Sequence, residues 1–202
     1  MSDEVRLVYE AMVTELQRTG FIEHVLRVGD RFPDLMLPNA EGELVAIADL
    51  LRRGPLVATF FRGEWCPYCR ITLDALAAAL PAFHVAGAGL VAITPETGGR
   101  ALIAKRNHSA DFEVLSDVDC GIGLTCGVVF RAPEPYRLLL LKYGTDIAER
   151  HGNPAWFLPV PATFVVDRGG TVRWRFVSFD FAERAEPADI LTALHALGVA
   201  EG

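Results

Sequence analysis

The chain has 202 residues, 51% of them hydrophobic and 22% charged, a composition typical of one globular domain with a full core. Its formal net charge of -7, with Lys and Arg residues scattered along the sequence, argues against nucleic-acid binding. We find neither a signal-like leader nor an apolar run of the roughly 20 residues that span a membrane, so we expect a cytoplasmic protein without a membrane partner.

The first segment is predicted to form a helix over residues 3–19, ended by Gly20. Its apolar residues recur at spacings of three and four and fall near one face: Val5, Val8, Met12 and Leu16. We divide the chain into an N-terminal helical extension, residues 1–25, and a single domain, residues 26–202. The apolar stripe of the helix motivates the hypothesis that the protein forms a homodimer through this extension.

The middle of the chain alternates between strands and helices. Near-continuous apolar runs at residues 55–61 and 89–94 predict strands that are covered on both faces of a sheet. Leucines at helical spacing lie between them, after Cys66, and such a strand, helix and strand are typical of a parallel crossover unit. The shorter predicted elements are a hairpin with strands at 35–37 and 44–46, a helix after Thr97, a strand at 112–115 and a helix near Asp117.

The last third contains an irregular segment, a hairpin and a helix. Residues 128–160 combine prolines and aromatic residues with a run of leucines, and we expect an excursion with one short helix. Alternating apolar and polar residues beside a turn at 167–170 predict the hairpin. The final helix is predicted to begin near Pro187, because proline suits a first helical turn.

The stretch "FFRGEWCPYCR", residues 60–70, contains the most informative chemistry. Cys66 lies between the predicted strand and the predicted helix, and a helix N-terminus lowers cysteine pKa values to about 3.5 to 7.5. Pro67 fits the first turn, and Cys69 lies about one turn further on, within reach of a disulfide. The pattern predicts that Cys66 is the attacking thiol and that Cys69 resolves the product.

Two alternatives remain for these thiols. A structural zinc site needs four ligands, but the other cysteines, Cys120 and Cys126, form a C-x5-C pair rather than a second tight pair. A purely structural pair of buried cysteines is the second alternative. We expect no metal and no cofactor, and we interpret Cys120 and Cys126 as core residues, with a second thiol pair or a resolving thiol as the alternative.

The sequence resembles a bacterial family of peroxiredoxin-like proteins in the alkyl hydroperoxide reductase and thiol-specific antioxidant (AhpC/TSA) group. The resemblance covers most of the chain and rests on five segments: "VGDRFPDLMLPN", "FFRGEWCPYC", "FEVLSDV", "LPVPATFVVDRGGTVRW" and "FDFAERAEPADIL". It implies an α/β, thioredoxin-like fold, in which helices flank a mixed central sheet. The N-terminal helix and residues 128–160 are then an extension and an insertion before the last hairpin.

The resemblance also assigns a role to Pro161 in "VPATF". Thioredoxin-like folds place a cis proline opposite the dithiol, and such a bond would leave the backbone of Val160 free to pair with an extended substrate. The alternative is that Pro161 merely begins a strand.

Several positions depart from the family pattern. Typical peroxiredoxins have a proline where this chain has Thr59 and a threonine or serine where it has Gly63. They have an arginine where this chain has Pro161. Arg62 is a candidate for the lost positive charge, either stabilising the thiolate or orienting a peroxide, with a surface or salt-bridged arginine as the alternative. Trp65 is a candidate shield for the site, or a packing residue.

The expected function is that of an antioxidant-type thiol oxidoreductase, which cycles a Cys66/Cys69 dithiol and reduces protein disulfides or hydroperoxides. A dedicated thiol-dependent peroxidase with Cys66 as the peroxidatic cysteine is the first alternative. A non-catalytic redox-sensing or binding protein on the same fold is the second. Thioredoxin, glutaredoxin and glutathione are the candidate electron donors.

Overall fold

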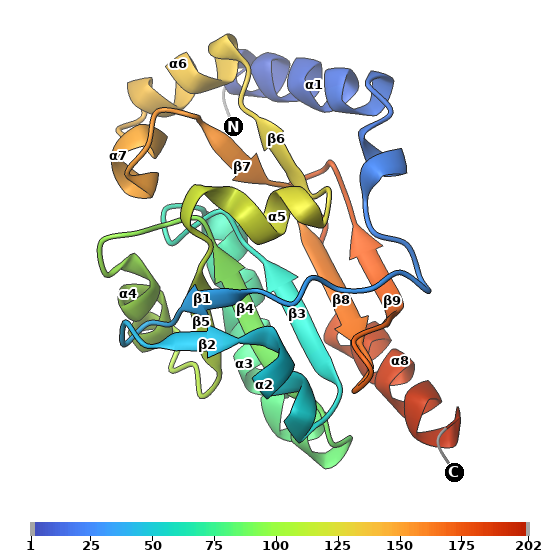
Figure 1. The fold of residues 1–202 in the computed structure, drawn as a ribbon. Helices are drawn as coiled ribbons and strands as arrows, with labels where there is room; N and C mark the ends of the chain where they lie inside the picture. Colours follow the sequence, from blue (N-terminus) through green and yellow to red (C-terminus); the bar gives the residue numbers. More distant parts are fainter. Residues whose placement is uncertain (1–2, 201–202) are drawn as a thin grey trace.

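A five-stranded mixed sheet forms the centre of the molecule in the computed structural model, which describes residues 3–200 (Figure 1). The strand order is β5-β4-β3-β8-β9, in which β3, β4 and β5 are parallel while β8 and β9 are antiparallel to their neighbours. The strands are β3 (Leu56–Phe60), β4 (Gly89–Thr94), β5 (Glu113–Ser116), β8 (Ala162–Val166) and β9 (Val172–Val177). The mixed sheet and all five strands agree with the predictions.

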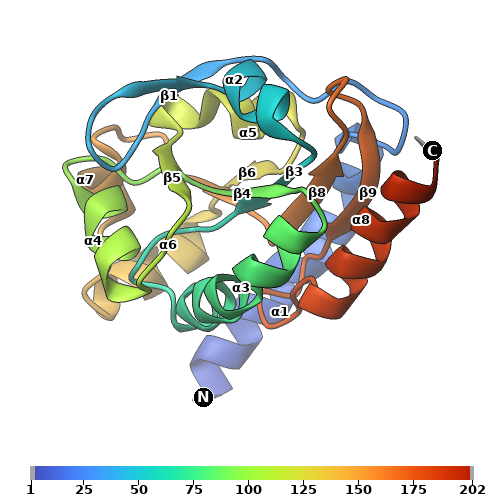
Figure 2. The same cartoon turned by 90° about the horizontal axis from the view of Figure 1, so that it is seen from below.

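Helices cover both faces of this sheet, which therefore has two apolar cores (Figure 2). Successive side chains of a strand point to opposite faces, so Val57 belongs to one core while Ala58 and Phe60 belong to the other. The first core contains α3 (Pro67–Val85), α4 (Arg100–Asn107) and α8 (Pro187–Ala200). The second contains α1 (Asp3–Arg18), α2 (Ile47–Arg53), α5 (Gly121–Thr125), α6 (Glu134–Lys142) and α7 (Ile147–His151).

The N-terminal helix α1 packs on the domain beside α6 (Figure 1). Met12 and Leu16 are buried in the same core as the sheet, and Lys142 of α6 forms an ion pair with Glu4 at 2.6 Å. The apolar stripe that suggested homodimerisation is thus directed at the chain's own core. The outermost residues of the predicted extension and domain, 1–2 and 201–202, lie outside the described part of the chain.

Residues 128–160 are more regular than predicted. They contain two helices, α6 and α7, and two short strands, β6 (Val129–Arg131) and β7 (Phe157–Pro159), which pair antiparallel in a separate sheet. The segment thus contains more than the short helix that we predicted, because a helix of five residues and strands of three residues are too short to show a periodic pattern.

The remaining elements are β1 (Met36–Pro38), β2 (Leu44–Ala46) and two short 3-10 helices, Phe21–His24 and Val118–Cys120. Strands β1 and β2 form the predicted antiparallel hairpin. Helix α2 was not predicted. Among the described residues, no helix has both the length and the apolar character needed to cross a membrane.

Candidate active site

The two thiols lie at the start of α3, just beyond the carboxyl end of β3. Cys66 is the N-cap residue of α3 and Pro67 occupies its first turn, as predicted. Both side chains are buried, with 0% of Cys66 and 3% of Cys69 exposed to solvent. Cys69 lies about one helical turn beyond Cys66, where its thiol and backbone N–H favour the ionised form of the Cys66 sulfur. The structure therefore brings the two thiols together, in a site without open access to solvent.

Arg62 is the charged group next to the thiols. Its Nη2 donates to the Cys66 Sγ at 3.0 Å and its Nη1 donates to the Tyr136 hydroxyl at 2.8 Å. Its guanidinium lies over the Phe181 ring, 3.8 Å from the centroid, and 5.1 Å from the centroid of the Trp65 ring. Arg62 is buried, and within residues 3–200 no carboxylate forms an ion pair with it. The surface or salt-bridged alternative for this residue is therefore wrong.

The pKa values of the two thiols move in opposite directions. Hydrogen bonding from Cys69 has the largest effect on the pKa of Cys66, and the charge of Arg62 acts in the same direction. Together they outweigh burial and lower this pKa to about 5. Burial is the first cause that raises the pKa of Cys69 well above its ordinary value, followed by its hydrogen bond to Cys66. At neutral pH the site holds a Cys66 thiolate beside a protonated Cys69.

The loop before Cys66 is fixed by a buried carboxylate. Glu96 accepts a hydrogen bond from the Glu64 backbone N–H at 2.9 Å and one from Arg150 at 2.9 Å. Gly63 has a φ of 140°, and any β-carbon at this position would collide with the Glu96 carboxyl group. The packing of Glu96 explains why glycine stands where typical peroxiredoxins have threonine or serine.

The carboxylate of Glu64 is directed to other partners, although it lies close to Cys66 in the sequence. It contacts the His108 ring at 3.0 Å and accepts a hydrogen bond from Asn107 at 2.8 Å. His108 in turn contacts Asp74 at 2.6 Å.

Val160 and Pro161 differ from what the resemblance implies. The described chain contains no cis peptide bond, so the bond before Pro161 is trans and the expectation of a cis proline is wrong. The Val160 N–H donates to the Val128 carbonyl at 2.9 Å, and the Pro161 carbonyl accepts from the Ser178 N–H at 3.0 Å. The insertion containing β6 and β7 thus occupies the backbone that an extended substrate would need. Pro161 directly precedes β8, in agreement with the alternative that it begins a strand.

Trp65 is partly buried and packs against both cores, while its indole N–H donates to the Arg62 carbonyl at 3.2 Å. Cys120 and Cys126 are buried, and burial raises the pKa of Cys120 to about 12 and that of Cys126 further. Both match the prediction of inert core residues.

Sequence reasoning missed three residues of the site: Tyr136, Phe181 and Arg184. Tyr136 and Phe181 contact Arg62, and the guanidinium of Arg184 lies 3.9 Å from the Cys69 sulfur. All three lie far beyond the dithiol in the sequence, and no local pattern connects them to it.

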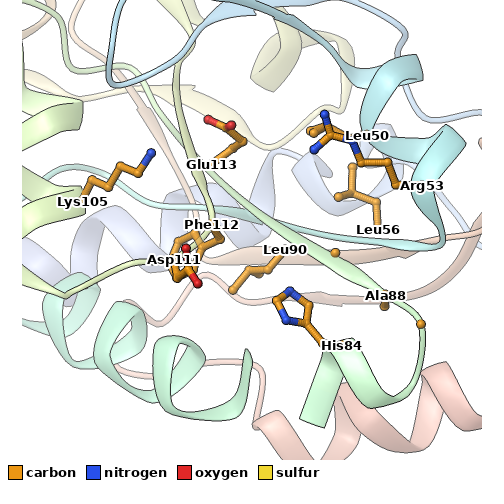
Figure 3. A pocket seen from close by; sticks show the side chains of 12 residues that line it. Leu50, Arg53, Leu56, His84, Ala88, Leu90, Lys105, Asp111, Phe112 and Glu113 are labelled. Atoms are coloured by element: carbon orange, nitrogen blue, oxygen red, sulfur yellow. The ribbon is translucent and has the colours of Figure 1, made fainter. Parts of the chain in front are cut away.

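A cavity of about 510 Å³ lies at the opposite, amino end of β3 and β4 (Figure 3). Its lining combines both signs of charge, including Arg53, Lys105, Asp111 and Glu113, around Leu56 and Leu90. Because Leu56 begins β3 and the thiols follow its end, the length of the strand separates this cavity from the dithiol.

The fold and the paired thiols define a thiol-dependent oxidoreductase. The AhpC/TSA family model matches residues 28–175, and the chain belongs to this family. Helix α1 and the residues after 175 lie outside the match. A comparison with curated proteins finds no match.

Solved structures of peroxiredoxins share the fold. Peroxidoxin BcpB from Mycobacterium tuberculosis has a TM-score of 0.66 at 21% identity, covering 85% of this chain and 98% of that chain. A cysteine-to-serine mutant of peroxiredoxin 6 from Arenicola marina has a TM-score of 0.70 at 12% identity, covering 87% and 75%. Peroxiredoxin Q from Xanthomonas campestris has a TM-score of 0.62 at 19% identity, covering 86% and 98%. These similarities confirm the predicted thioredoxin-like fold class.

Proposed function

We propose that the protein is a thiol-dependent peroxidase in which Cys66 attacks a hydroperoxide and Cys69 resolves the oxidised product. One observation carries the proposal: the buried Arg62 guanidinium has no carboxylate partner in the described chain and donates to the Cys66 sulfur at 3.0 Å. A buried cation needs an anion, and the thiolate is the group in position to supply it. This function is narrower than the general dithiol exchange that the sequence predicts, and corresponds to its first alternative.

The reaction proceeds in two covalent steps. The Cys66 thiolate attacks the terminal peroxide oxygen, so that an S–O bond forms and the O–O bond breaks. Cysteine is oxidised to sulfenic acid, and the departing alkoxide takes a proton from water to give an alcohol. Cys69 then loses its proton and attacks the Cys66 sulfur, forming the disulfide and releasing the sulfenic oxygen as water. Two electrons from a thiol donor reduce the disulfide again.

Arg62 supports the first step in two ways. Its charge keeps Cys66 ionised, because hydrogen bonds and positive charge favour thiolate over thiol. Its N–H groups are also preorganised donors for the charge that develops on the departing oxygen, and buried donors of this kind stabilise a transition state strongly. Arg62 therefore replaces the residues of the typical family set that are absent at positions 63 and 161.

Protein disulfide reduction is the second candidate, since a C-x-x-C pair on this fold permits it. Two features favour a small peroxide instead. Both sulfurs are buried, and the Val160 N–H, which an extended peptide substrate would use, is already bonded to Val128. The donor that we propose is a cellular thiol, namely thioredoxin, glutaredoxin or glutathione.

Stopped-flow oxidation of the reduced protein by hydrogen peroxide, followed by intrinsic tryptophan fluorescence, tests the proposal. We expect rapid second-order oxidation that disappears in Cys66→Ser and that proceeds in Cys69→Ser without disulfide formation. Oxidation no faster than that of free glutathione, both by hydrogen peroxide and by an organic hydroperoxide, would refute a peroxidase. If the same protein then reduced insulin disulfides rapidly, the second candidate would replace it.

A further inference from the structure

Arg184 is a charged residue on the Cys69 side of the dithiol. It lies in the segment between β9 and α8, and its Nη2 is 3.9 Å from the Cys69 Sγ, a distance at which an N–H group donates to a sulfur. Its Nη1 donates to the Glu183 carbonyl at 2.6 Å, and its guanidinium carbon lies 6.0 Å from the centroid of the Tyr68 ring. These two contacts hold the guanidinium beside the sulfur.

The charge of Arg184 is available to this sulfur. Among the residues that the structure describes, no carboxylate forms an ion pair with Arg184. The carboxylate of the neighbouring Glu183 instead accepts a hydrogen bond from the Ser178 hydroxyl at 2.6 Å. The side chain of Arg184 is half-buried, so it keeps part of its contact with solvent while its Nη2 faces Cys69.

Oxidation of Cys66 changes the surroundings of Cys69. In the reduced site, burial is the first cause that raises the pKa of Cys69, followed by the hydrogen bond to Cys66 and the negative charge of that thiolate. In its sulfenic acid form Cys66 is uncharged, so its charge no longer opposes ionisation of Cys69. The positive charges of Arg62 and Arg184, which both favour the Cys69 thiolate, stay in place. Titratable and charged groups thus face Cys69 from four segments: Cys66 from α3, Arg62 from the loop after β3, Tyr136 from α6 and Arg184 from the segment before α8.

We propose that Arg184 is a catalytic residue of the resolving step, in which it stabilises the Cys69 thiolate that attacks the oxidised Cys66. The inference rests on the proposed peroxidase function. In this step the Cys69 thiol loses its proton and its sulfur attacks, so that an S–S bond forms and the S–O bond of the sulfenic acid breaks. Cys69 is oxidised, the sulfenic sulfur is reduced by the same electron pair, and the hydroxyl leaves with a proton as water.

The two arginines then act in different steps of the cycle. Arg62 faces Cys66 and acts in the attack on the peroxide, whereas Arg184 faces Cys69 and acts when that attack is complete. Arg184 lies beyond residue 175, where the AhpC/TSA match ends. Its role is therefore carried by a part of the chain that the family model does not cover.

Stopped-flow tryptophan fluorescence tests this role, because attack on hydrogen peroxide is second-order and disulfide formation is first-order. Arg184→Met should slow the first-order phase by roughly 3- to 10-fold at neutral pH, since less Cys69 is ionised and the greater nucleophilicity of the remaining thiolate offsets only part of the loss. The second-order phase should be unchanged, because Arg62 still faces Cys66. Dimedone should accordingly capture more of the sulfenic acid in the variant.

A charge series at this position separates electrostatics from packing. Arg184→Lys should restore most of the resolving rate, whereas Arg184→Glu should slow it more than Arg184→Met does. The pH at which the first-order rate levels off should be higher in the Met and Glu variants, a change that a role in packing alone would not produce. Arg53→Met, at an exposed arginine of α2, is the control and should leave both phases unchanged. Equal resolving rates in the wild type and in the Met and Glu variants would overturn the proposal.

Ionisation of Cys69 can also be measured without turnover, in Cys66→Ser protein. The NMR chemical shift of the isotope-labelled Cβ of Cys69 should report ionisation at higher pH when Arg184→Met is added to this background. Coincident titrations in the two proteins would overturn the role of Arg184 alone. Slow oxidation of the wild type, both by hydrogen peroxide and by an organic hydroperoxide, would instead overturn the peroxidase function.

Discussion

At the scale of single residues, the chemistry of the site depends on one buried arginine. Arg62 comes four residues before Cys66 and is held by Tyr136 from α6 and by the ring of Phe181. Burial of a guanidinium is costly, and the charge is retained because it faces a sulfur that becomes negative in response. The low pKa of Cys66 and the lack of a carboxylate beside Arg62 among residues 3–200 are therefore two aspects of one arrangement.

Replacing Arg62 tests this dependence. Arg62→Met should raise the pKa of Cys66 from about 5 towards the ordinary cysteine value, because a positive charge and a hydrogen bond are lost. The thiolate is the reactive form and predominates above the pKa. The rate of alkylation by iodoacetamide should therefore fall only below about pH 5 in the wild type, whereas in the variant the rate should begin to fall at a higher pH. Oxidation by hydrogen peroxide should slow by about 100-fold, in line with the loss of one oxyanion donor.

The control for this experiment is Arg53→Met, at an exposed arginine of α2. Its alkylation profile should coincide with that of the wild type. An Arg62→Met profile that also coincides with the wild type would show that the helix N-terminus and Cys69 alone keep Cys66 ionised.

The resolving thiol permits a second test at this scale. In Cys69→Ser, one equivalent of peroxide should leave a stable sulfenic acid on Cys66, because Cys120 and Cys126 are buried with raised pKa values. Dimedone labelling followed by mass spectrometry detects the product. Disulfide formation between Cys66 and either core cysteine would instead support the alternative of a second resolving thiol.

At the scale of elements, the join between β3 and α3 positions the thiol. The segment from Phe61 to Cys66 passes over Glu96, which follows β4, and Arg150 of α7 holds the Glu96 carboxylate from the other side. The segment after β4 and helix α7 thus fix the backbone that precedes the nucleophile. In this arrangement the glycine at position 63 is a requirement of packing rather than a loss of function.

From this role of Gly63 we predict that a family-like residue at this position lowers stability, the opposite of what comparison with the family alone would suggest. Gly63→Thr introduces a residue that typical peroxiredoxins have, yet it should destabilise the protein by roughly 1 to 3 kcal/mol, the usual cost of a strained backbone. The cause is the collision with Glu96 together with the φ of 140°. Urea denaturation measures the loss, and stopped-flow oxidation should be slower than in wild type.

A double variant separates the two causes. Glu96→Ala removes the carboxyl group that collides with the new side chain, so Gly63→Thr should cost less stability in a Glu96→Ala protein than in the wild type. Faster peroxide oxidation in Gly63→Thr than in wild type would contradict this account of the loop.

Elements with long, continuous apolar patterns were the ones that the sequence could predict. Strands β3 and β4 are buried along almost their whole length, and α3 shows its apolar face through Leu73, Leu76 and Leu80. Strands β6 and β7 are three residues each and are defined by pairing with each other, which no local pattern records. The same region explains why Val160 is not free to pair with a substrate, as had been expected. Its N–H donates to the Val128 carbonyl, next to β6.

The residues of the site also fall into two groups, those that the sequence could predict and those that it could not. Cys66, Cys69 and Arg62 are neighbours in the sequence. The chemistry of a helix N-terminus was enough to single out the two cysteines, while Arg62 was named only against the family pattern. Tyr136 and Phe181 come from distant segments and join the site only when the chain folds. Thiol chemistry was therefore predictable from the sequence, whereas the surroundings from which we infer a peroxide rather than a protein disulfide as the substrate were not.

At the scale of the whole molecule, segments from near the two ends of the chain meet over the active site. The Tyr9 hydroxyl of α1 donates to Asp180 at 2.7 Å and accepts from the Phe181 N–H, joining residues that are 171 and 172 positions apart. The Phe181 ring in turn covers Arg62. Helix α1 is thus connected to the Cys66 sulfur through Phe181 and Arg62.

Tyr9→Phe should weaken this connection. It leaves the Phe181 N–H and the Asp180 carboxylate without their shared partner, and we expect a loss of about 1 to 3 kcal/mol in the free energy of unfolding. Faster hydrogen exchange at the Phe181 amide is the specific readout. Tyr143→Phe, which changes a largely exposed side chain, is the control. Equal exchange at Phe181 in both variants would show that Tyr9 does not hold the segment.

Because Phe181 lies far beyond Cys66 in the sequence, the surroundings of Arg62 are completed late in synthesis. A nascent chain that has not yet emerged beyond residue 180 contains Cys66, Cys69 and Arg62, but not the ring that covers the guanidinium. The enclosure of Arg62, whose charge lowers the pKa of Cys66, is completed only when the segment with Phe181 folds back onto α1 and α6. A chain without this segment therefore has the dithiol and Arg62 but lacks one wall of the site.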